Sequence, residues 1–276
     1  LSPMSSSAST PATPIESSSG STRPPMPWRA KGRAFAIHLG ISMLVAALAA
    51  WLVFGLWFPY PYGELAGGRR LFLLLLGVDV VLGPLLTFVV FNPRKRLREK
   101  VLDFTVIGLL QLGALGYGLW TVAQARPVHL VYEYSRLAVV AAAQVPADQL
   151  EKAPPGLRAL PWTGPTLLSL RPLQGAKEQF ESTMMAANGV PQAAQTELWQ
   201  PYDAGRAAIL ETARPLDGLK TKYPAEIALI DSAIAKTGKP ADRLLYMPVL
   251  SRDTAWSVLI DAETARPVGF VPLDPY

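Results

Sequence analysis

Residues 34–58, AFAIHLGISMLVAALAAWLVFGLWF, decide the fold class, because His38 is the single ionisable side chain among these 25 residues. A helix of this length reaches ~37 Å at about 1.5 Å per residue, enough to cross the ~30 Å hydrocarbon core of a bilayer. Two further apolar runs follow after short connections, at residues 71–91 and at residues 104–123. The short connections leave no neighbouring elements that could bury these runs inside a soluble core. The sequence therefore predicts three transmembrane helices.

Basic residues indicate which ends of these helices face the cytoplasm. Four of them lie between positions 23 and 33, and five, against one acid, lie in the loop at 92–100. The connection between the first two apolar runs holds only Arg69 and Arg70. The positive-inside rule therefore predicts that the N-terminus and the 92–100 loop are cytoplasmic. Three crossings then place everything after Arg126 on the opposite side, which for a bacterial inner membrane is the periplasm.

Aromatic residues near the helix ends agree with this orientation. Six of them fall towards the periplasmic ends of the predicted helices, where amphipathic rings settle at the membrane–water interface. They are Trp51, Trp57, Tyr60, Tyr62, Tyr117 and Trp120. We therefore expect an aromatic belt on the periplasmic side.

The charge and polarity of the chain predict three parts. Residues 1–27 are rich in Ser, Thr and Pro with almost nothing to bury, which is typical of a disordered leader. Residues 28–126 form the predicted membrane domain, and residues 127–276 the predicted periplasmic domain. Residues 1–126 carry a net charge of +7 and the remainder −2, so the overall +5 describes neither part.

The N-terminal region leaves two alternatives open. Translation could start at Leu1, Met4 or Met26, and Met26 is attractive because structure-like sequence begins two residues later. The basic residues, the apolar stretch and Ala47-Leu48-Ala49 could also form a cleavable signal peptide. The apolar run continues for nine residues beyond Ala49, longer than a signal peptide requires, so a retained helix is favoured.

Asp79 is the polar outlier of the second predicted helix, about 12 Å from its periplasmic end. A carboxylate inside a membrane is expensive and points to a function, such as proton relay or contact with a partner. The structural alternative is an Asp packed between helices, sharing its burial with Gly77, Gly83 and the backbone freed by Pro84. His38 lies nearer the cytoplasmic end, so no base is expected at the depth of Asp79. Packing or partner contact is therefore favoured over transport.

The third predicted helix is rich in small residues. Ala114 and Gly118 have the small-xxx-small spacing that lets two helices approach closely. This spacing is compatible with packing among the three helices or with a groove for a fourth. The candidate contacts for a partner helix are Asp79, Gly113, Ala114, Gly116 and Gly118.

Residues 127–276 predict an α+β domain with a mainly antiparallel sheet, because strand patterns lie at both ends with helices between them. A helix over residues 225–236 would place Ile227, Ile230 and Ile234 on one face. The predicted strands lie within 127–142, 167–173, 243–250, 256–260 and 268–271. The other predicted helices are a short one at the start of 145–165 and two longer ones at 176–188 and 202–213.

Residues suited to catalysis are scarce. There is no cysteine, there are two histidines, and no nucleophile elbow, zinc-protease or P-loop motif is present. His129, inside a predicted strand, is expected to be a surface or satisfied histidine rather than a ligand. A charge of −2 argues against nucleic acid. We therefore predict no enzymatic activity, catalytic residue, metal or cofactor. The scattered acids, expected on polar faces or near helix ends, include Asp203, Glu211, Asp217 and Glu226.

Several strings along residues 28–276 resemble the TfpX/TfpZ family of type IV pilin accessory proteins. They are WRAKGRAFAIHLGIS, LFLLLLGVDVVLGPLLTFVVFNPRKR, VIGLLQLGALGYGLWTVAQARPVHLVYE, LPWTGP, QPYDAGRAAIL, YMP and GFVPLDPY. The resemblance implies an inner-membrane protein, without catalytic residues, that supports pilin in the membrane and pilus assembly. The leader at 1–27 departs from the short N-terminus of that family.

These inferences together predict an inner-membrane accessory protein for type IV pilin. The three helices would shelter the pilin helix, and the periplasmic domain would contact the pilin head. The expected partners are the major pilin, the lipid bilayer and other pilus assembly components. Two alternatives of other classes remain: a membrane-anchored periplasmic enzyme using scattered carboxylates, and a periplasmic ligand receptor. A signalling receptor is disfavoured because the chain has no predicted cytoplasmic output domain.

Overall fold

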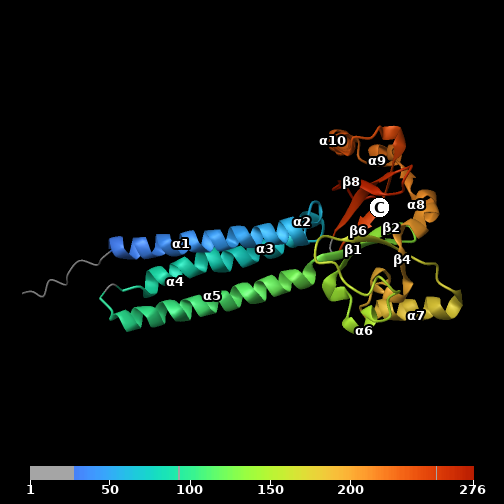
Figure 1. Cartoon of the computed structure of the whole chain (residues 1–276). Helices are drawn as coiled ribbons and strands as arrows, with labels where there is room; N and C mark the ends of the chain where they lie inside the picture. The colour runs from blue at the N-terminus through green and yellow to red at the C-terminus, as the bar shows by residue number, and fades with distance from the viewer. Residues whose placement is uncertain (1–27, 93, 253) are drawn as a thin grey trace, which may run out of the picture.

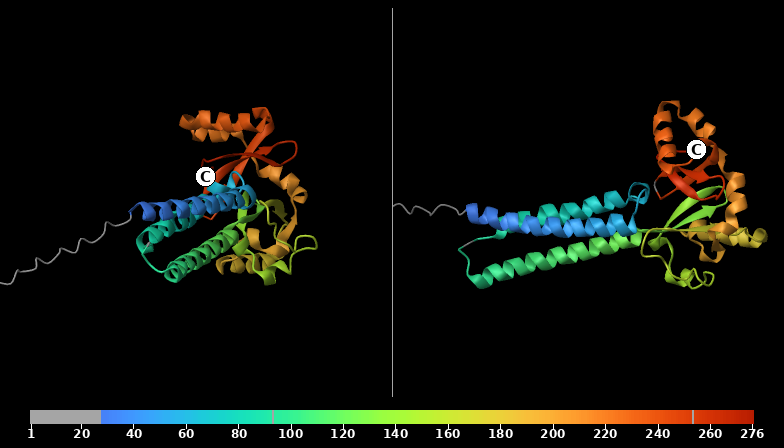
Figure 2. Two further views of the ribbon diagram at one scale, coloured as in Figure 1. Left: turned by 60° about the vertical axis from the view of Figure 1, so that its left-hand side comes forward. Right: turned by 45° about the horizontal axis from the view of Figure 1, so that its top comes forward.

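The computed structural model describes residues 28–92, 94–252 and 254–276, so the predicted leader at 1–27 lies outside the described residues. Three long helices lie side by side, and a mixed α/β unit follows at one end of them (Figure 1). The two further views show the same arrangement from other sides (Figure 2). The chain thus combines a membrane unit with a sheet unit.

Each of the three helices is long and apolar enough to cross a membrane, which confirms this part of the prediction for the described residues. The first runs through α1 and the π-helical η1; the second through α3, the π-helical η2 and α4; the third is α5. Their bounds are α1 (Trp28–Ala50), η1 (Trp51–Trp57), α3 (Gly68–Leu76), η2 (Gly77–Leu82), α4 (Gly83–Val90) and α5 (Leu97–Ala125). A helix is suited to the lipid interior because it pairs its backbone N–H and C=O groups internally, and lipid offers them no other partners.

Within the described residues the sheet has eight strands in the order β4-β3-β1-β2-β6-β7-β8, with β5 pairing on β6. Five of the seven pairings are antiparallel, whereas β1–β3 and β2–β6 are parallel, so the sheet is mixed but mainly antiparallel. The strands are β1 (Pro127–Glu133), β2 (Arg136–Ala141), β3 (Thr166–Leu170), β4 (Trp199–Pro201), β5 (Arg214–Pro215), β6 (Leu244–Leu250), β7 (Ala255–Asp261) and β8 (Pro267–Val271).

Short helices lie on both sides of the sheet, with α6 and α7 below it and α9 and α10 above it in Figure 1. The α-helices are α6 (Ala147–Leu150), α7 (Gly175–Ala187), α8 (Arg206–Thr212), α9 (Leu216–Lys222) and α10 (Ile227–Thr237). The 3-10 turns are η3 (Ala142–Gln144), η4 (Gln192–Ala194), η5 (Thr196–Leu198), η6 (Tyr202–Gly205), η7 (Pro224–Glu226) and η8 (Ala241–Arg243). Helix α9 and strands β4 and β5 have no counterpart in the sequence prediction.

The central strand β1 is buried along its whole length because apolar clusters cover both of its faces. Leu130 and Tyr132 join one cluster, whereas Val128 and Val131 join the other. A register shift between Pro127 and His129 interrupts the regular alternation of side chains, so Val128 lies on the same face as Val131 rather than on that of Leu130. The sheet is therefore the middle layer of the unit.

The helix predicted over residues 225–236 is present as α10, and its three isoleucines differ in burial. Ile230 and Ile234 are buried against the sheet, but Ile227 is 40% exposed. Ile227 is more exposed because α10 begins at this residue, and its first turn lies beyond the cluster that Ile230 and Ile234 join.

The connection between the first two membrane helices is part of the sheet core. It contains a single helical turn, α2 (Tyr62–Leu65), whose Tyr62 and Leu65 are buried with Leu130 and Met247. The ring of Tyr62 meets that of Phe270 edge-on, with centroids 6.0 Å apart. The membrane unit and the sheet unit therefore share one apolar core.

This shared core corrects the predicted aromatic belt. Tyr62 is buried inside the sheet core, and Trp57 is buried among the ends of the membrane helices. Both are removed from the membrane–water interface because the sheet unit sits directly on the helix ends. The four remaining rings of the predicted belt are exposed: Trp51, Tyr60, Tyr117 and Trp120.

Replacing Leu65 tests this shared core. Leu65 is 1% exposed, and Leu65→Ala should lower the free energy of unfolding of the sheet unit by about 2–5 kcal/mol, because it leaves a cavity. Pulse proteolysis of the full chain in detergent would measure the change. The matched control is Glu64→Ala on the same turn, since the Glu64 side chain is mostly exposed and forms a surface ion pair with Arg69. Equal stability of the two variants would contradict a shared core.

Candidate functional site

An apolar groove of about 510 Å³ lies between α1 and α5, with Asp79 of the second helix in its wall. Its lining residues recur at helical spacing on both helices, so one face of α1 and one face of α5 point towards the same space. We call it the Asp79 groove, defined by Ala34, Ile37, His38, Ile41, Ser42, Val45, Asp79, Phe104, Gly108, Gln111, Leu112 and Leu115.

The groove exists because the second helix separates the other two. Helix α1 packs on α4 and η2, whereas α5 packs on α3, α4 and η2. Figure 1 shows the second helix lying between α1 and α5 over most of their length. Gly108 adds to the hollow, since nothing lies within 4 Å of the position its Cβ would occupy. The two apolar faces are thus left without a partner helix.

Asp79 is buried to 8% exposure, and neither Oδ1 nor Oδ2 has a hydrogen-bond partner among the described residues. A buried polar group without a partner costs free energy, and in hydrocarbon no water is at hand to offset it. Asp79 is therefore a strong candidate for contact with something that enters the groove.

The backbone of Asp79, in contrast, is satisfied by a side chain from the third helix. In π-helical geometry the carbonyl of residue 79 would accept from the N–H of residue 84, which Pro84 lacks. The amide of Gln111 donates to this carbonyl at 3.3 Å. Gly83 makes room for Gln111, because a Cβ at that position would lie 1.9 Å from Gln111 Nε2. This local geometry leaves the Asp79 carboxyl as the unpaired group.

His38 lines the same groove but is bonded elsewhere. Its Nδ1 lies 2.5 Å from Oγ1 of the buried Thr87. Thr87 stands eight residues after Asp79, or roughly 12 Å along the helix. His38 is therefore held away from the depth of Asp79, as the sequence predicts.

The small residues of α5 do not face one common surface. Gly118 packs internally, because a Cβ there would lie 2.3 Å from Leu75 of α3. Gly113 and Gly116 have nothing within 4 Å of their Cβ positions and do not line the groove. Ala114 is half-buried. The structure therefore does not bring the predicted contacts together with Asp79 as one set.

Sequence reasoning missed Gln111 and Gly108 as residues of the site. The signal for Gln111 was available, since a lone amide in an otherwise apolar membrane helix is expected to face protein rather than lipid. Gly108 could not be distinguished from the other glycines of its helix, because the face that each occupies depends on how the helices pack.

The chain has relatives among fimbrial assembly proteins. A family model described as fimbrial assembly protein FimB matches residues 26–67, which include α1, η1 and α2. The fimbrial assembly protein of serogroup I from Dichelobacter nodosus is 37% identical over 227 residues, which cover 82% of this chain and 88% of that protein. The chain belongs to the fimbrial assembly protein family.

Two further members of this family extend the match. The fimbrial assembly protein of serogroup E1 from Dichelobacter nodosus is 34% identical over 227 residues, covering 82% of this chain and 88% of that protein. The protein of serogroups C1 and C2 is 43% identical over 117 residues, covering 42% of this chain and 89% of that protein. No solved structure is significantly similar. The narrower likeness to TfpX/TfpZ proteins stays a prediction.

The scattered acids that the sequence analysis named lie on the surface of the sheet unit of this fimbrial assembly family member. Asp203, Glu211, Asp217 and Glu226 are exposed, which confirms their predicted place on polar faces or near helix ends. Asp203 accepts two hydrogen bonds from the guanidinium of Arg266, each 3.0 Å long. Among the described residues no group of three or more His, Cys, Asp or Glu converges in the manner of a metal site.

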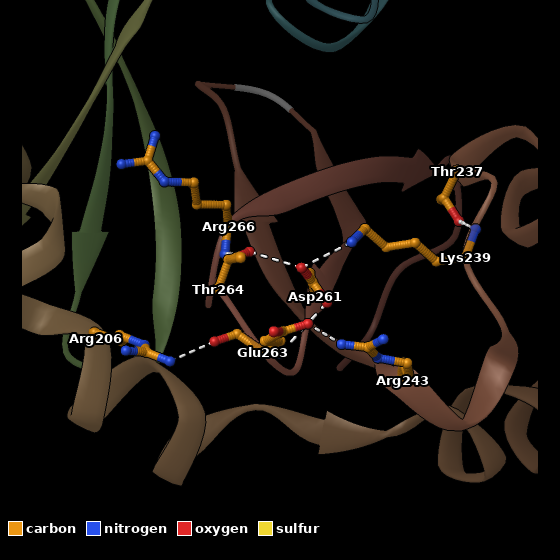
Figure 3. A network of polar contacts seen from close by, with 8 residues as sticks. All are labelled: Arg206, Thr237, Lys239, Arg243, Asp261, Glu263, Thr264 and Arg266. Atoms are coloured by element: carbon orange, nitrogen blue, oxygen red, sulfur yellow. Dashed lines mark hydrogen bonds and ion pairs between the residues drawn. The ribbon is translucent and has the colours of Figure 1, made fainter.

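A network of polar contacts surrounds the turn between β7 and β8 (Figure 3). Asp261 is 1% exposed and accepts a hydrogen bond from Nζ of Lys239 at 2.9 Å, which lowers the pKa of its carboxyl. Glu263 pairs with Arg243 through its side chain and accepts from Arg206 through its carbonyl. These partners fasten the turn to neighbouring segments, so the network holds the fold together.

His129 in β1 was predicted to be a surface or satisfied histidine, and the structure excludes the surface alternative. It is 2% exposed, its Nδ1 lies 2.8 Å from Oγ1 of Thr166 on β3, and its ring meets Trp199 edge-on at 4.7 Å. Its Nε2 is buried without a partner among the described residues. Burial lowers the pKa of His129 to about 4, so the ring is neutral at pH 7.

This burial predicts a loss of stability in mild acid. Because the unfolded chain binds a proton near pH 6.5 and the folded chain only near pH 4, the free energy of unfolding falls as the pH drops through this interval. The fall from His129 should be roughly 2 kcal/mol between about pH 7 and about pH 5. Urea unfolding of the full chain in detergent would measure it.

The control for this pH effect is His129→Gln, whose amide can still bond Thr166 but does not titrate. The variant should lack the extra fall between these two pH values. Identical pH profiles for the variant and the parent chain would show that His129 is not held neutral by burial.

Proposed function

We propose that this protein is an inner-membrane accessory protein for type IV pilin, and that the Asp79 groove receives the transmembrane helix of the major pilin. Two uncovered apolar helix faces and an unpaired carboxyl within a membrane unit carry this proposal. The relatives from Dichelobacter nodosus are described as fimbrial assembly proteins, which supports a role in pilus assembly. Other pilus assembly components would bind the complex of this protein with pilin.

The distribution of basic residues supports a cytoplasmic N-terminus and a periplasmic sheet unit. The basic start of α1 lies beside the end of α4, where the ring of Trp28 stacks on Phe88 with centroids 6.1 Å apart. The basic connection from α4 to α5 lies at this same end, opposite the sheet unit (Figure 1). By the positive-inside rule this end faces the cytoplasm.

A pilin helix would complete what the groove lacks. Its apolar side chains would cover the faces of α1 and α5. Lipid tails are as apolar as these side chains, so van der Waals packing rather than the hydrophobic effect drives helix association in a membrane. A hydroxyl, amide or amine on the pilin helix would donate to Asp79. Hydrogen bonds between membrane helices contribute about 0.6–2 kcal/mol each. Asp79 would therefore fix the register of the pilin helix and add little to its binding affinity.

The sheet unit is placed to contact the globular head of the same pilin. Strand β1 starts at Pro127, so Arg126 alone separates it from the third membrane helix. The buried Tyr62 and Leu65 attach the sheet a second time, to the connection between the first two helices. Two attachments hold the sheet unit close above the groove, on the side where the head of a bound pilin would lie.

Photocrosslinking from α5 tests where the pilin helix lies. Leu112 lines the groove and is 67% exposed, whereas Leu110 is 66% exposed on the same helix and does not line it. A photoreactive amino acid at Leu112 should give pilin adducts in cells, and the same amino acid at Leu110 should give few. Immunoblotting for pilin would measure both. Adducts from Leu110 alone, or from neither position, would refute the groove as the pilin site.

Filling the groove tests whether assembly needs it. Gly108→Leu projects a side chain into the groove, whereas Gly113→Leu adds the same side chain on a surface outside it; neither position has a clashing atom within 4 Å. At equal protein level, Gly108→Leu should lose most surface pili in a shearing assay, and Gly113→Leu should keep them. The reverse result would assign pilin contact to the small-residue face that the sequence predicts.

A further inference from the structure

The connection between α6 and β3, residues 151–165, lies against the ends of two membrane helices. The N–H of Gly164 donates to the carbonyl of Leu56, next to the last residue of the first membrane helix, at 2.7 Å. Gly164 also lies against the ring of Pro59, which is 3.2 Å from the position of a Cβ at residue 164. This segment, the Trp162 loop, is therefore held against the end of the first membrane helix.

Trp162 reaches the end of the third membrane helix as well. Its ring lies 4.6 Å from the guanidinium carbon of Arg126, the residue directly after α5. Arg126 donates to the carbonyl of Ala123 at 2.6 Å and is buried to 6% exposure, without an acidic partner among the described residues. Although it covers Arg126, Trp162 remains 67% exposed.

We propose that the Trp162 loop lies in the headgroup layer of the bilayer, with the ring of Trp162 inserted at the membrane–water interface. Two contacts, to Leu56 and to Arg126, set the depth of this ring at the ends of the first and third membrane helices. An exposed tryptophan at this depth fits the interface, which accommodates both its apolar ring and its N–H group.

The lipid headgroup layer also suits the charge of this region. Arg126 is a cation whose contacts within the chain are a carbonyl and an aromatic ring, and because it is buried, phosphate groups in the headgroup layer would favour its charge through space rather than by direct contact. Trp51, Tyr60, Tyr117 and Trp120 are exposed towards the same end of the membrane helices and would share this layer. The loop thus provides the sheet unit with a contact to lipid beyond its covalent link at Arg126 and its packing on Tyr62 and Leu65.

Site-directed labelling distinguishes lipid from water around Trp162, because the chain has no cysteine to interfere. A nitroxide at Trp162→Cys would be compared with one at Phe180→Cys, since Phe180 is 66% exposed on α7, away from the membrane helices (Figure 1). The full chain would be reconstituted in nanodiscs of phosphatidylethanolamine and phosphatidylglycerol. Power saturation would measure access to oxygen, which concentrates in lipid, and to a water-soluble nickel chelate.

The expected result is a severalfold higher oxygen-to-nickel ratio at position 162 than at position 180. A label at the exposed Thr163→Cys keeps Trp162 in place and should give the same result. Water-like ratios at positions 162 and 163, equal to that at 180, would overturn the proposal. Shielding that occurs only after pilin is added would overturn it too, and would assign this surface to the partner. Neither result depends on whether pilin binds in the Asp79 groove.

Discussion

Hydrocarbon offers no hydrogen-bond partners, and this constraint shapes the membrane unit residue by residue. Pro84 removes one backbone N–H, the π-helical turn leaves the carbonyl of Asp79 without a donor, and Gln111 crosses from the third helix to supply one. Gly83 is needed for that crossing because a side chain there would collide with Gln111. The contact fastens the third helix to the second and, since α1 packs on the second helix independently, leaves the space between α1 and α5 open.

The same constraint gives the Asp79 carboxyl its significance. A carboxyl in water needs no protein partner. Inside a bilayer, a carboxyl without a hydrogen-bond donor raises the free energy of the folded state, and other interactions of the fold must offset this. Because Asp79 stands in the wall of an apolar groove, a polar group on a helix from another chain is the donor that our proposal supplies. The pilin-binding function proposed for this member of the fimbrial assembly family follows from that position, together with the names of its relatives.

The junction between the membrane helices and the sheet is equally important for the architecture. Tyr62 and Leu65 lie in the connection between two membrane helices yet are buried in the core of the sheet, and Gly164 and Trp162 bring a loop of the sheet unit back to the helix ends. A sheet attached in this way cannot swing freely on a linker. The sheet unit therefore keeps a fixed place at the ends of the helices that form the groove.

The sequence by itself determined the three membrane helices, most of the strands and the polar exception at Asp79. These depend on local properties: apolar length, alternation of side chains and the cost of a charge in lipid. Only the tertiary structure decided that Tyr62 is buried in the sheet, that Ile227 is exposed, and that Gly118 packs on Leu75 while Gly113 faces away. An amphipathic tyrosine fits a membrane interface and a domain core equally well, and a glycine carries no sign of the face it will occupy. Which of these outcomes occurs depends on neighbours distant in the chain, and those neighbours exist only once the helices and the sheet have packed together.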